Sequence, residues 1–160
     1  MSEASSALRR ALGRYTTGVT IVACLDAAGN RIGLTANSFC SLSLDPPLVL
    51  WSLREASPSL PVFEAAPRFA INVLTEAQVE LSRRFASKLG NKFDEGAWAQ
   101  GEHGAPVLAG CAAVFECELV SQQTAGDHRL FIGRVLAHAE AALSPLVFQG
   151  GHYHLLGEVL

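Results

Sequence analysis

The sequence predicts a mainly β protein, a closed antiparallel β-barrel with two or three flanking helices. Apolar, β-branched runs recur along the chain, the connections between them are mostly short, and few segments have helical spacing. Many strands with few intervening helices are typical of a barrel rather than of a doubly wound parallel sheet. At 160 residues, the chain is expected to form one domain, residues 1–160, with a core of its own.

Composition argues against several classes of protein. A hydrophobic fraction of 49% with 17% charged residues is unlike that of a disordered chain. A net charge of −3, without a run of Lys or Arg, argues against a nucleic-acid partner. No apolar run is long enough to span a membrane, and the first residues lack a signal-peptide core. The four cysteines form no CxxC pair, so we expect reduced, mostly buried thiols in a cytoplasmic protein and no metal site.

Three segments are predicted to form or begin helices. Leu8 and Leu12 have helical spacing within residues 5–15, which predicts a short amphipathic helix. Ser57 to Pro61 resembles a helix start, with Ser at the N-cap and proline in the first turn. Thr75 to Gln78 matches the capping-box pattern at the start of a third helix. The residues expected on one face of that helix are Ala77, Leu81 and Phe85.

Strands are predicted where apolar or β-branched residues cluster between turn residues. The predicted strands are Thr20–Leu25, a hairpin partner after the turn Asp26–Asn30, Leu48–Leu53, Phe69–Leu74, Cys111–Val120, Arg129–Glu140, Pro145–Phe148 and His152–Leu156. The double proline Pro46-Pro47 ends any earlier ladder before the strand at Leu48. Gly90 to Ala109 is rich in Gly, Asn, Asp and Glu and is expected to form a long ordered excursion, of the kind that is functional or shields something.

The stretch Gly33–Phe39 is small, polar and rich in hydroxyl groups, and it lies between two apolar runs. We expect it to cross the edge or mouth of the sheet. Thr35, Asn37 and Ser38 offer donors and acceptors without charge, and Gly33 allows the backbone to approach a ligand closely. These features suit a planar polar ligand, and the alternative is an ordinary polar turn.

Familiar catalytic motifs are missing from the sequence. It has no G-x-S-x-G element, P-loop or GxGxxG fingerprint, which argues against a serine hydrolase and a Rossmann nucleotide site. Helix starts at Ser57 and Ser59, and at Thr75, are candidate anion sites. Arg83 and Arg84 lie two turns into the third helix, where they either add charge to such a pocket or form a solvated face.

Gly126-Asp127-His128 precedes a predicted strand, so His128 is expected near the barrel mouth. Histidine is the side chain best suited to donate a proton or hydrogen bond near neutral pH. A structural histidine in a Gly-Asp turn is the alternative.

In their order along the chain, several fragments resemble the flavin reductase-like family, short-chain NAD(P)H:flavin oxidoreductases with a split-barrel, FMN-binding fold of Greek-key type. The fragments are Tyr15–Val19, Leu34–Phe39 with Ser41 and Ser43, Asp45–Leu48, Phe69–Leu74, Leu81–Phe85, Gly126–His128 with Ile132–Val135, and Pro145-Leu146 followed by Tyr153. Each fragment alone is weak, whereas seven in the expected order are specific. The resemblance covers nearly the whole chain.

The resemblance also implies a role for particular residues. It implies that the isoalloxazine and ribityl chain of the flavin lie along Thr35, Ala36, Asn37 and Ser38. The remainder of the flavin would be held by Ser52, Leu53, Ser57 and Ser59, and its phosphate end by Ser82, Arg83 and Phe85. His128 would be the catalytic residue that places the nicotinamide, with Tyr153 at the edge of that pocket.

The function that the resemblance implies is an NAD(P)H-dependent flavin reductase. Such an enzyme uses NADH or NADPH as hydride donor and FMN or FAD as acceptor, supplies reduced flavin to a separate monooxygenase, and commonly forms a homodimer. A non-catalytic FMN-binding or electron-transfer module of the same fold is the alternative. An oxidase of pyridoxamine-phosphate type would need several basic residues around a substrate phosphate, and the sequence is poor in them outside Arg83 and Arg84.

Overall fold

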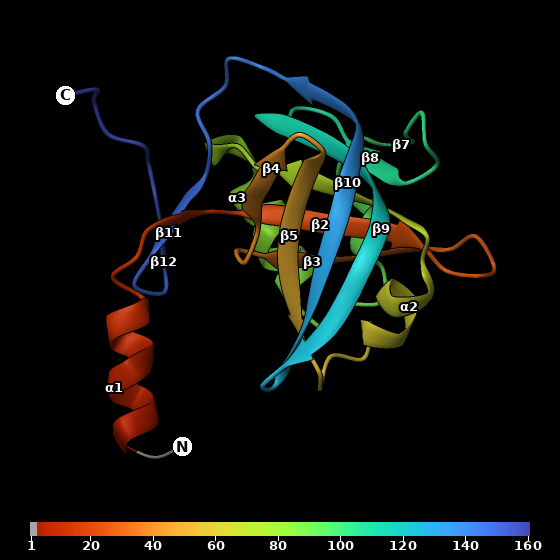
Figure 1. The fold of residues 1–160 in the computed structure, drawn as a ribbon. Helices are drawn as coiled ribbons and strands as arrows, with labels where there is room; N and C mark the ends of the chain where they lie inside the picture. The colour runs from red at the N-terminus through yellow and green to blue at the C-terminus, as the bar shows by residue number, and fades with distance from the viewer. Residues whose placement is uncertain (1–2) are drawn as a thin grey trace.

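The computed structural model describes residues 3–160 and confirms a mainly β, antiparallel fold with three α-helices in that part of the chain (Figure 1). The helices are α1 (Glu3–Leu12), α2 (Leu60–Ala65) and α3 (Val79–Ala86), with 3-10 turns η1 (Glu76–Gln78) and η2 (Lys92–Asp94). The strands are β1 (Thr17–Gly18), β2 (Thr20–Leu25), β3 (Arg31–Ala36), β4 (Cys40–Leu44), β5 (Pro47–Arg54), β6 (Arg68–Val73), β7 (Trp98–Gln100), β8 (Pro106–Leu108), β9 (Ala113–Ala125), β10 (His128–Glu140), β11 (Val147–Gln149) and β12 (His152–His154).

Seven strands form the main sheet, in the order β3-β2-β6-β9-β10-β5-β4, and every neighbouring pair is antiparallel. β3 and β4 lie at its two edges, and among the described residues they do not pair with each other. The antiparallel sheet is therefore confirmed, whereas closure of the barrel stays a prediction. β1, β11 and β12 form a second, small sheet, and β7 and β8 form a hairpin.

The inner face of the sheet packs around Trp51. Alternate residues of β5 point inward, so Val49, Trp51 and Leu53 are buried. The Trp51 ring stacks on Phe131 of β10 at a centroid distance of 4.7 Å and meets Phe63 of α2 edge-on at 5.0 Å. Offset-stacked and edge-on pairs add to the free energy gained by burying aromatic surface.

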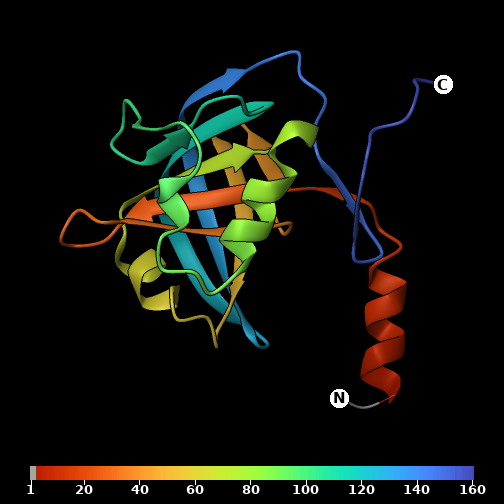
Figure 2. The ribbon, with the colours of Figure 1, turned by 180° about the vertical axis from the view of Figure 1, so that it is seen from behind.

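A second apolar cluster lies behind the sheet, where α3 crosses it (Figure 2). Phe85 of α3 packs edge-on against Phe93 at 4.9 Å, and Trp98 lies 5.3 Å from Phe85. A Cβ atom at Gly33 of β3 would lie 2.9 Å from the Phe93 ring and 3.0 Å from the Phe85 ring. Gly33 is thus needed so that two aromatic rings can rest on the backbone of β3.

The Gly90–Ala109 excursion is ordered, as predicted, and is fixed to the sheet by a buried amide. Asn72 of β6 is fully buried; its Oδ1 accepts the backbone N–H of Leu108 at 2.8 Å, and its Nδ2 donates to the Ile21 carbonyl at 3.2 Å. These bonds satisfy the amide and attach β8 to the strands beneath it, because an unpaired buried polar group would be costly.

Strand β4 is absent from the sequence prediction. Gly33 to Ala36 belongs to β3, so only Asn37 to Phe39 crosses from one edge of the sheet to the other. The sequence of β4, Cys-Ser-Leu-Ser-Leu, alternates small polar and apolar residues and contains no continuous apolar run. Such a pattern suits an edge strand, which has less apolar surface to bury than a central one.

The helix predictions are confirmed in part. α2 begins at Leu60 with Ser59 at the N-cap position and proline in its first turn, as predicted, although Ser59 makes no side-chain capping bond. The capping box of the third helix is confirmed, with Gln78 Oε1 accepting the Thr75 N–H at 3.0 Å. Its first turn is a 3-10 turn, which has a different periodicity, and Ala77 is exposed instead of sharing the buried face.

Helix α1 does not flank the sheet. In both views it stands apart from the main sheet, beside the β11–β12 hairpin (Figures 1 and 2). It ends at Leu12, earlier than predicted, and none of its described residues is buried. A backbone hydrogen bond from Gly150 to the Gly13 carbonyl, 2.9 Å long, joins its end to the hairpin. Within residues 3–160, no helix has the length and apolar character needed to cross a membrane.

The four cysteines divide into three buried thiols and one exposed thiol, Cys40. Burial raises the pKa of the Cys24 and Cys117 thiols to about 12 and that of Cys111 to about 11. Because the thiolate is the reactive form, these three groups are protonated and unreactive near neutral pH.

A thiol-labelling experiment is therefore expected to modify Cys40 alone in the folded protein and all four cysteines after denaturation. Cys40→Ser is the control and is expected to abolish the rapid reaction. Rapid modification of a second thiol in the folded protein would contradict the burial described above.

Candidate functional site

Ser38 joins the loop after β3 to strand β5. Its hydroxyl donates to the Ser52 carbonyl at 2.9 Å and accepts the Ser52 backbone N–H at 3.0 Å. Ser38 lies two residues before β4, and the β4–β5 register, in which Cys40 pairs with Leu50, places it opposite Ser52, so these bonds extend the β4–β5 pairing into the loop that leaves β3. The structure thus brings together two of the predicted groups, Thr35 to Ser38 and the end of β5.

A second set of contacts joins β3, α3 and β12. The Thr35 hydroxyl donates to the Ser82 carbonyl at 2.6 Å, and a hydrogen bond of 2.8 Å joins Ser82 Oγ to the Tyr153 hydroxyl. The guanidinium carbon of Arg83 lies 5.6 Å from the centre of the Tyr153 ring, within cation–π range. Ser82 is fully buried, whereas Arg83 is exposed. The predicted phosphate-end residues therefore lie beside the Thr35 end of the polar stretch.

Ala36 and Asn37, in the same polar stretch, differ in how accessible they are to a ligand. Ala36 is partly buried against the core, and its carbonyl accepts the Thr20 hydroxyl at 2.7 Å. Asn37 is exposed, and its Nδ2 makes one long hydrogen bond, 3.4 Å, to Thr17 Oγ1. Asn37 is thus the amide in this segment that is most available to a ligand.

Leu53 and Phe85 support the site from beneath. Leu53 is 8% exposed and belongs to the inner core, and Phe85 is 1% exposed within the cluster behind the sheet. Both were predicted to contact the flavin. The structure places them as the packing under Ser52 and under Ser82.

The predicted anion site at the start of α2 is not built as expected. Ser57 Oγ accepts the Ser59 N–H at 3.3 Å, so the two serines bond to each other rather than cap the helix. They do follow directly on β5, near the turn that carries His128, because the Glu55 N–H donates to the Asp127 carbonyl at 2.9 Å.

His128 is the first residue of β10 and pairs with Arg54 of β5. Two residues along, Leu130 pairs with Ser52, so His128 lies on the same face of the strands as that pair, about 7 Å further along. Its Nδ1 donates to Asp127 Oδ1 at 2.8 Å, and this bond holds the pKa of the Asp127 carboxyl below its usual range. The aspartate thereby orients the imidazole.

Arg84 has a role that the sequence analysis did not find. Its Nε donates to the Lys92 carbonyl at 2.9 Å, and another of its nitrogens donates to the Asn91 carbonyl. In return, Lys92 Nζ donates to the Phe85 carbonyl at 3.1 Å, and burial lowers the pKa of this lysine. Arg84 thus ties the excursion to the C-terminal end of α3. No spacing in the sequence indicates bonds to backbone carbonyls.

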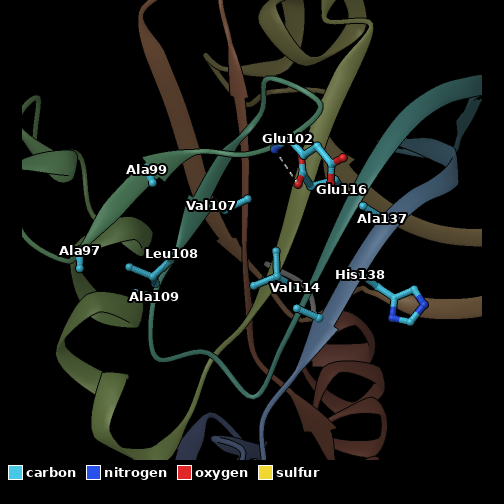
Figure 3. A pocket seen from close by; sticks show the side chains of 11 residues that line it. Ala97, Ala99, Glu102, Val107, Leu108, Ala109, Val114, Glu116, Ala137 and His138 are labelled. Carbon is cyan, nitrogen blue, oxygen red and sulfur yellow. Dashed lines mark hydrogen bonds between the residues drawn. The ribbon is translucent and has the colours of Figure 1, made fainter.

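A cavity of about 350 Å³ lies away from these residues, between the excursion and strands β9 and β10 (Figure 3). Its one deeply buried carboxylate, Glu116, accepts the backbone N–H groups of Glu102 at 3.0 Å and His103 at 2.7 Å. This carboxylate is therefore already used to hold the β7–β8 turn against β9. None of the predicted site residues lines this cavity.

The donor set fits a flavin. Hydroxyls, one exposed amide and backbone groups suit the neutral ring and its polyol chain, and Arg83 is the one guanidinium among the predicted contacts. Arg83 is itself paired with Glu80, so the site carries little net charge. Among residues 3–160, no group of His, Cys, Asp and Glu side chains is arranged to hold a metal ion.

The chain belongs to the family described as flavin reductase like domain, which matches residues 12–157. It is 46% identical over 151 residues to the FMN reductase (NADH) SmoA of Agrobacterium fabrum, covering 94% of this chain and 86% of that protein. It is 37% identical to HsaB of Mycobacterium tuberculosis, the reductase subunit of a flavin-dependent monooxygenase, covering 91% of this chain and 79% of that one. Two similar proteins of Rhizobium meliloti are longer, and the chain spans 47% and 64% of them.

A solved structure has the same fold. It is the NADH:FAD oxidoreductase SgcE6 of Streptomyces globisporus C-1027, in complex with NAD and FAD fragments. The TM-score is 0.91 at 36% identity, and the match covers 96% of this chain and 93% of that one. Membership of the family predicted from the sequence is thereby confirmed.

Ser38→Ala is expected to lower the free energy of unfolding by roughly 1–3 kcal/mol, since it leaves the Ser52 N–H and carbonyl without their partner. Urea unfolding followed by tryptophan fluorescence would measure the loss. Ser41→Ala, at an exposed position of β4, is the matched control and is expected to change little. Equal stability of the two variants would show that the Ser38 bonds do not stabilise the attachment of the β3–β4 loop to β5.

Proposed function

We propose that this chain is an NAD(P)H-dependent flavin reductase, which transfers a hydride from reduced nicotinamide to FMN or FAD. The observation that carries the proposal is the neutral polar edge, in which Ser38 is bonded to Ser52 and Thr35 to Ser82. Family membership and the activities named for SmoA and SgcE6 support the same reaction. Because HsaB is a reductase subunit of a monooxygenase, we further propose that a separate monooxygenase receives the reduced flavin.

The flavin supplies the redox chemistry, since no protein side chain accepts a hydride reversibly. The task of the chain is to hold two flat rings at reacting distance. The hydroxyls of Thr35 and Ser38 are fixed by bonds to carbonyls of α3 and β5, so the segment between them has a defined shape. Asn37, between the two, is free to hydrogen-bond the ligand.

The proposed roles follow the positions of the side chains. The proposed flavin contacts are Thr35, Ala36, Asn37, Ser38, Ser52, Ser57, Ser59, Ser82, Arg83 and Tyr153, with Leu53 and Phe85 beneath them. His128 is proposed to contact the nicotinamide. Its Nδ1 is engaged by Asp127, which leaves Nε2 as the ring nitrogen that can hydrogen-bond a substrate.

We also propose that residues 1–160 act as one domain in the cytoplasm, and that its main sheet closes as a split barrel. The short loop of residues 37–39 supports closure, because it joins the end of the edge strand β3 directly to the opposite edge strand β4. The free thiols of the four cysteines suit a reducing compartment.

The reductase is tested by mixing the purified protein with NADH or NADPH and with FMN, FAD or riboflavin, and following nicotinamide oxidation. We expect consumption well above the protein-free rate with at least one pair. A protein that purifies yellow, keeps its flavin through dialysis and does not oxidise nicotinamide would instead be the non-catalytic FMN-binding module.

Two variants separate the halves of the site. His128→Ala is expected to raise the KM for the nicotinamide by about tenfold, the loss of one hydrogen bond, with little effect on flavin affinity. Asn37→Ala is expected to weaken flavin binding by a similar factor and to leave the KM for the nicotinamide nearly unchanged. Equal effects of both variants on both ligands would mean that the two halves are misassigned.

A homodimer is proposed on the basis of uncovered apolar residues. Leu8 of α1 is 60% exposed and Leu44 of the edge strand β4 is 95% exposed. Large exposed leucines on an unpaired edge and on an uncovered helix are typical of an interface.

Sedimentation equilibrium is expected to give twice the mass of the chain, and Leu8→Ser with Leu44→Ser is expected to shift the protein toward the monomer. Leu89→Ser is the control, because Leu89, between α3 and the excursion, has an exposure similar to that of Leu8. A wild-type protein that sediments as a monomer at all accessible concentrations would refute the dimer.

A further inference from the structure

A groove of about 710 Å³ lies between α1 and the β11–β12 hairpin. This volume is within the range of small-molecule sites. Its lining combines Leu12, Gln149 and smaller residues with the side chains that the argument uses, which are Arg9, Arg10, Arg14, Tyr15, Asn37 and Phe148.

The three arginines of the groove are uncompensated. In the described part of the chain, none has a carboxylate within salt-bridge distance or a side-chain hydrogen bond, whereas Arg68, Arg129 and Arg134 all do. Arg9 and Arg10 lie in the last turn of α1, where cations favour the helix dipole. Arg14 lies beyond the helix end, so the dipole does not account for it. Three guanidinium groups around one groove make an anion the expected ligand.

The groove is continuous with the proposed flavin edge. Asn37 lines it and is also the exposed amide of that edge. On the other side, the Phe148 ring lies 5.5 Å from the ring of Tyr153, whose hydroxyl is bonded to Ser82. A ligand with its flat ring at Asn37 would therefore direct its remaining length toward the arginines.

We propose that this groove binds the adenosine diphosphate half of a dinucleotide, the part that FAD and NAD(P)H share and FMN lacks. The guanidinium groups of Arg9, Arg10 and Arg14 bind the pyrophosphate oxygens, for which their planar forks are suited. Tyr15, 80% exposed, offers its ring as a stacking face for the adenine. The identity of the dinucleotide rests on the proposed function. The binding of the adenosine diphosphate half does not.

The direct test is calorimetric titration with ADP alone, which needs no turnover. Arg14→Gln is expected to weaken ADP binding by about tenfold, the loss of one charge-assisted contact, and the triple variant with Arg9→Gln and Arg10→Gln is expected to abolish it. Arg31→Gln is the matched control, because Arg31 is exposed on β3, makes no ion pair with any residue that the structure describes and lies outside the groove. The absence of ADP binding by the wild type, or unchanged binding by the triple variant, would overturn the proposal.

Kinetics identify which dinucleotide uses the groove. If FAD does, Arg14→Gln raises the KM for FAD about tenfold and leaves that for FMN unchanged. If NADH occupies the groove, the variant raises the KM for NADH and leaves the KM for reduced nicotinamide mononucleotide unchanged. If the variant loses ADP binding but changes neither the KM for FAD relative to FMN nor the KM for NADH relative to reduced nicotinamide mononucleotide, the groove has no role in the reaction. Binding of ADP by a protein that oxidises no nicotinamide would refute the proposed reductase and leave the groove assignment standing.

Discussion

The bond pair between Ser38 and Ser52 is the contact on which the polar site depends. Among the described residues, the seven-stranded sheet leaves two unpaired edges, β3 and β4, which are connected by the loop of residues 37–39. One serine hydroxyl, used as donor and acceptor at once, fixes this loop to Ser52 of β5. Thr35 does the same toward α3. The few residues between these two anchors thereby acquire a fixed shape without becoming part of a ladder.

Rigidity of this edge comes from the layers behind it. Gly33 lets Phe85 and Phe93 rest on β3. Across the base of the excursion, Arg84 donates to the Lys92 carbonyl, and the Lys92 side chain donates to the Phe85 carbonyl. The excursion thus holds α3 in place, and α3 presents Ser82 and Arg83 to the site. Long-range contacts of this kind cost chain entropy, which the buried aromatic surface offsets.

Features with a local cause were predictable from the sequence. Thr20–Leu25, the Asp26–Asn30 turn and the capping box at Thr75 follow from β-branching, turn chemistry and hydrogen-bond geometry over a few residues. Strand β4 was missed because an edge strand needs little apolar surface. The roles of Arg84 and of the arginines near α1 were missed because they depend on backbone carbonyls or on a groove assembled from distant segments. The helical and strand periodicities of the sequence do not indicate contacts of this kind.

The low net charge of the polar edge has a consequence for electron energetics. A protein shifts the reduction potential of a bound flavin by as much as its affinities for the oxidised and reduced forms differ. Uncharged hydroxyls and an Arg83 already paired with Glu80 distinguish weakly between a neutral ring and an anionic one. The potential of the bound flavin would then remain near that of the free molecule. The free-energy change of hydride transfer would then be set by the potentials of the flavin and the nicotinamide, and the protein would determine only how the two rings are placed.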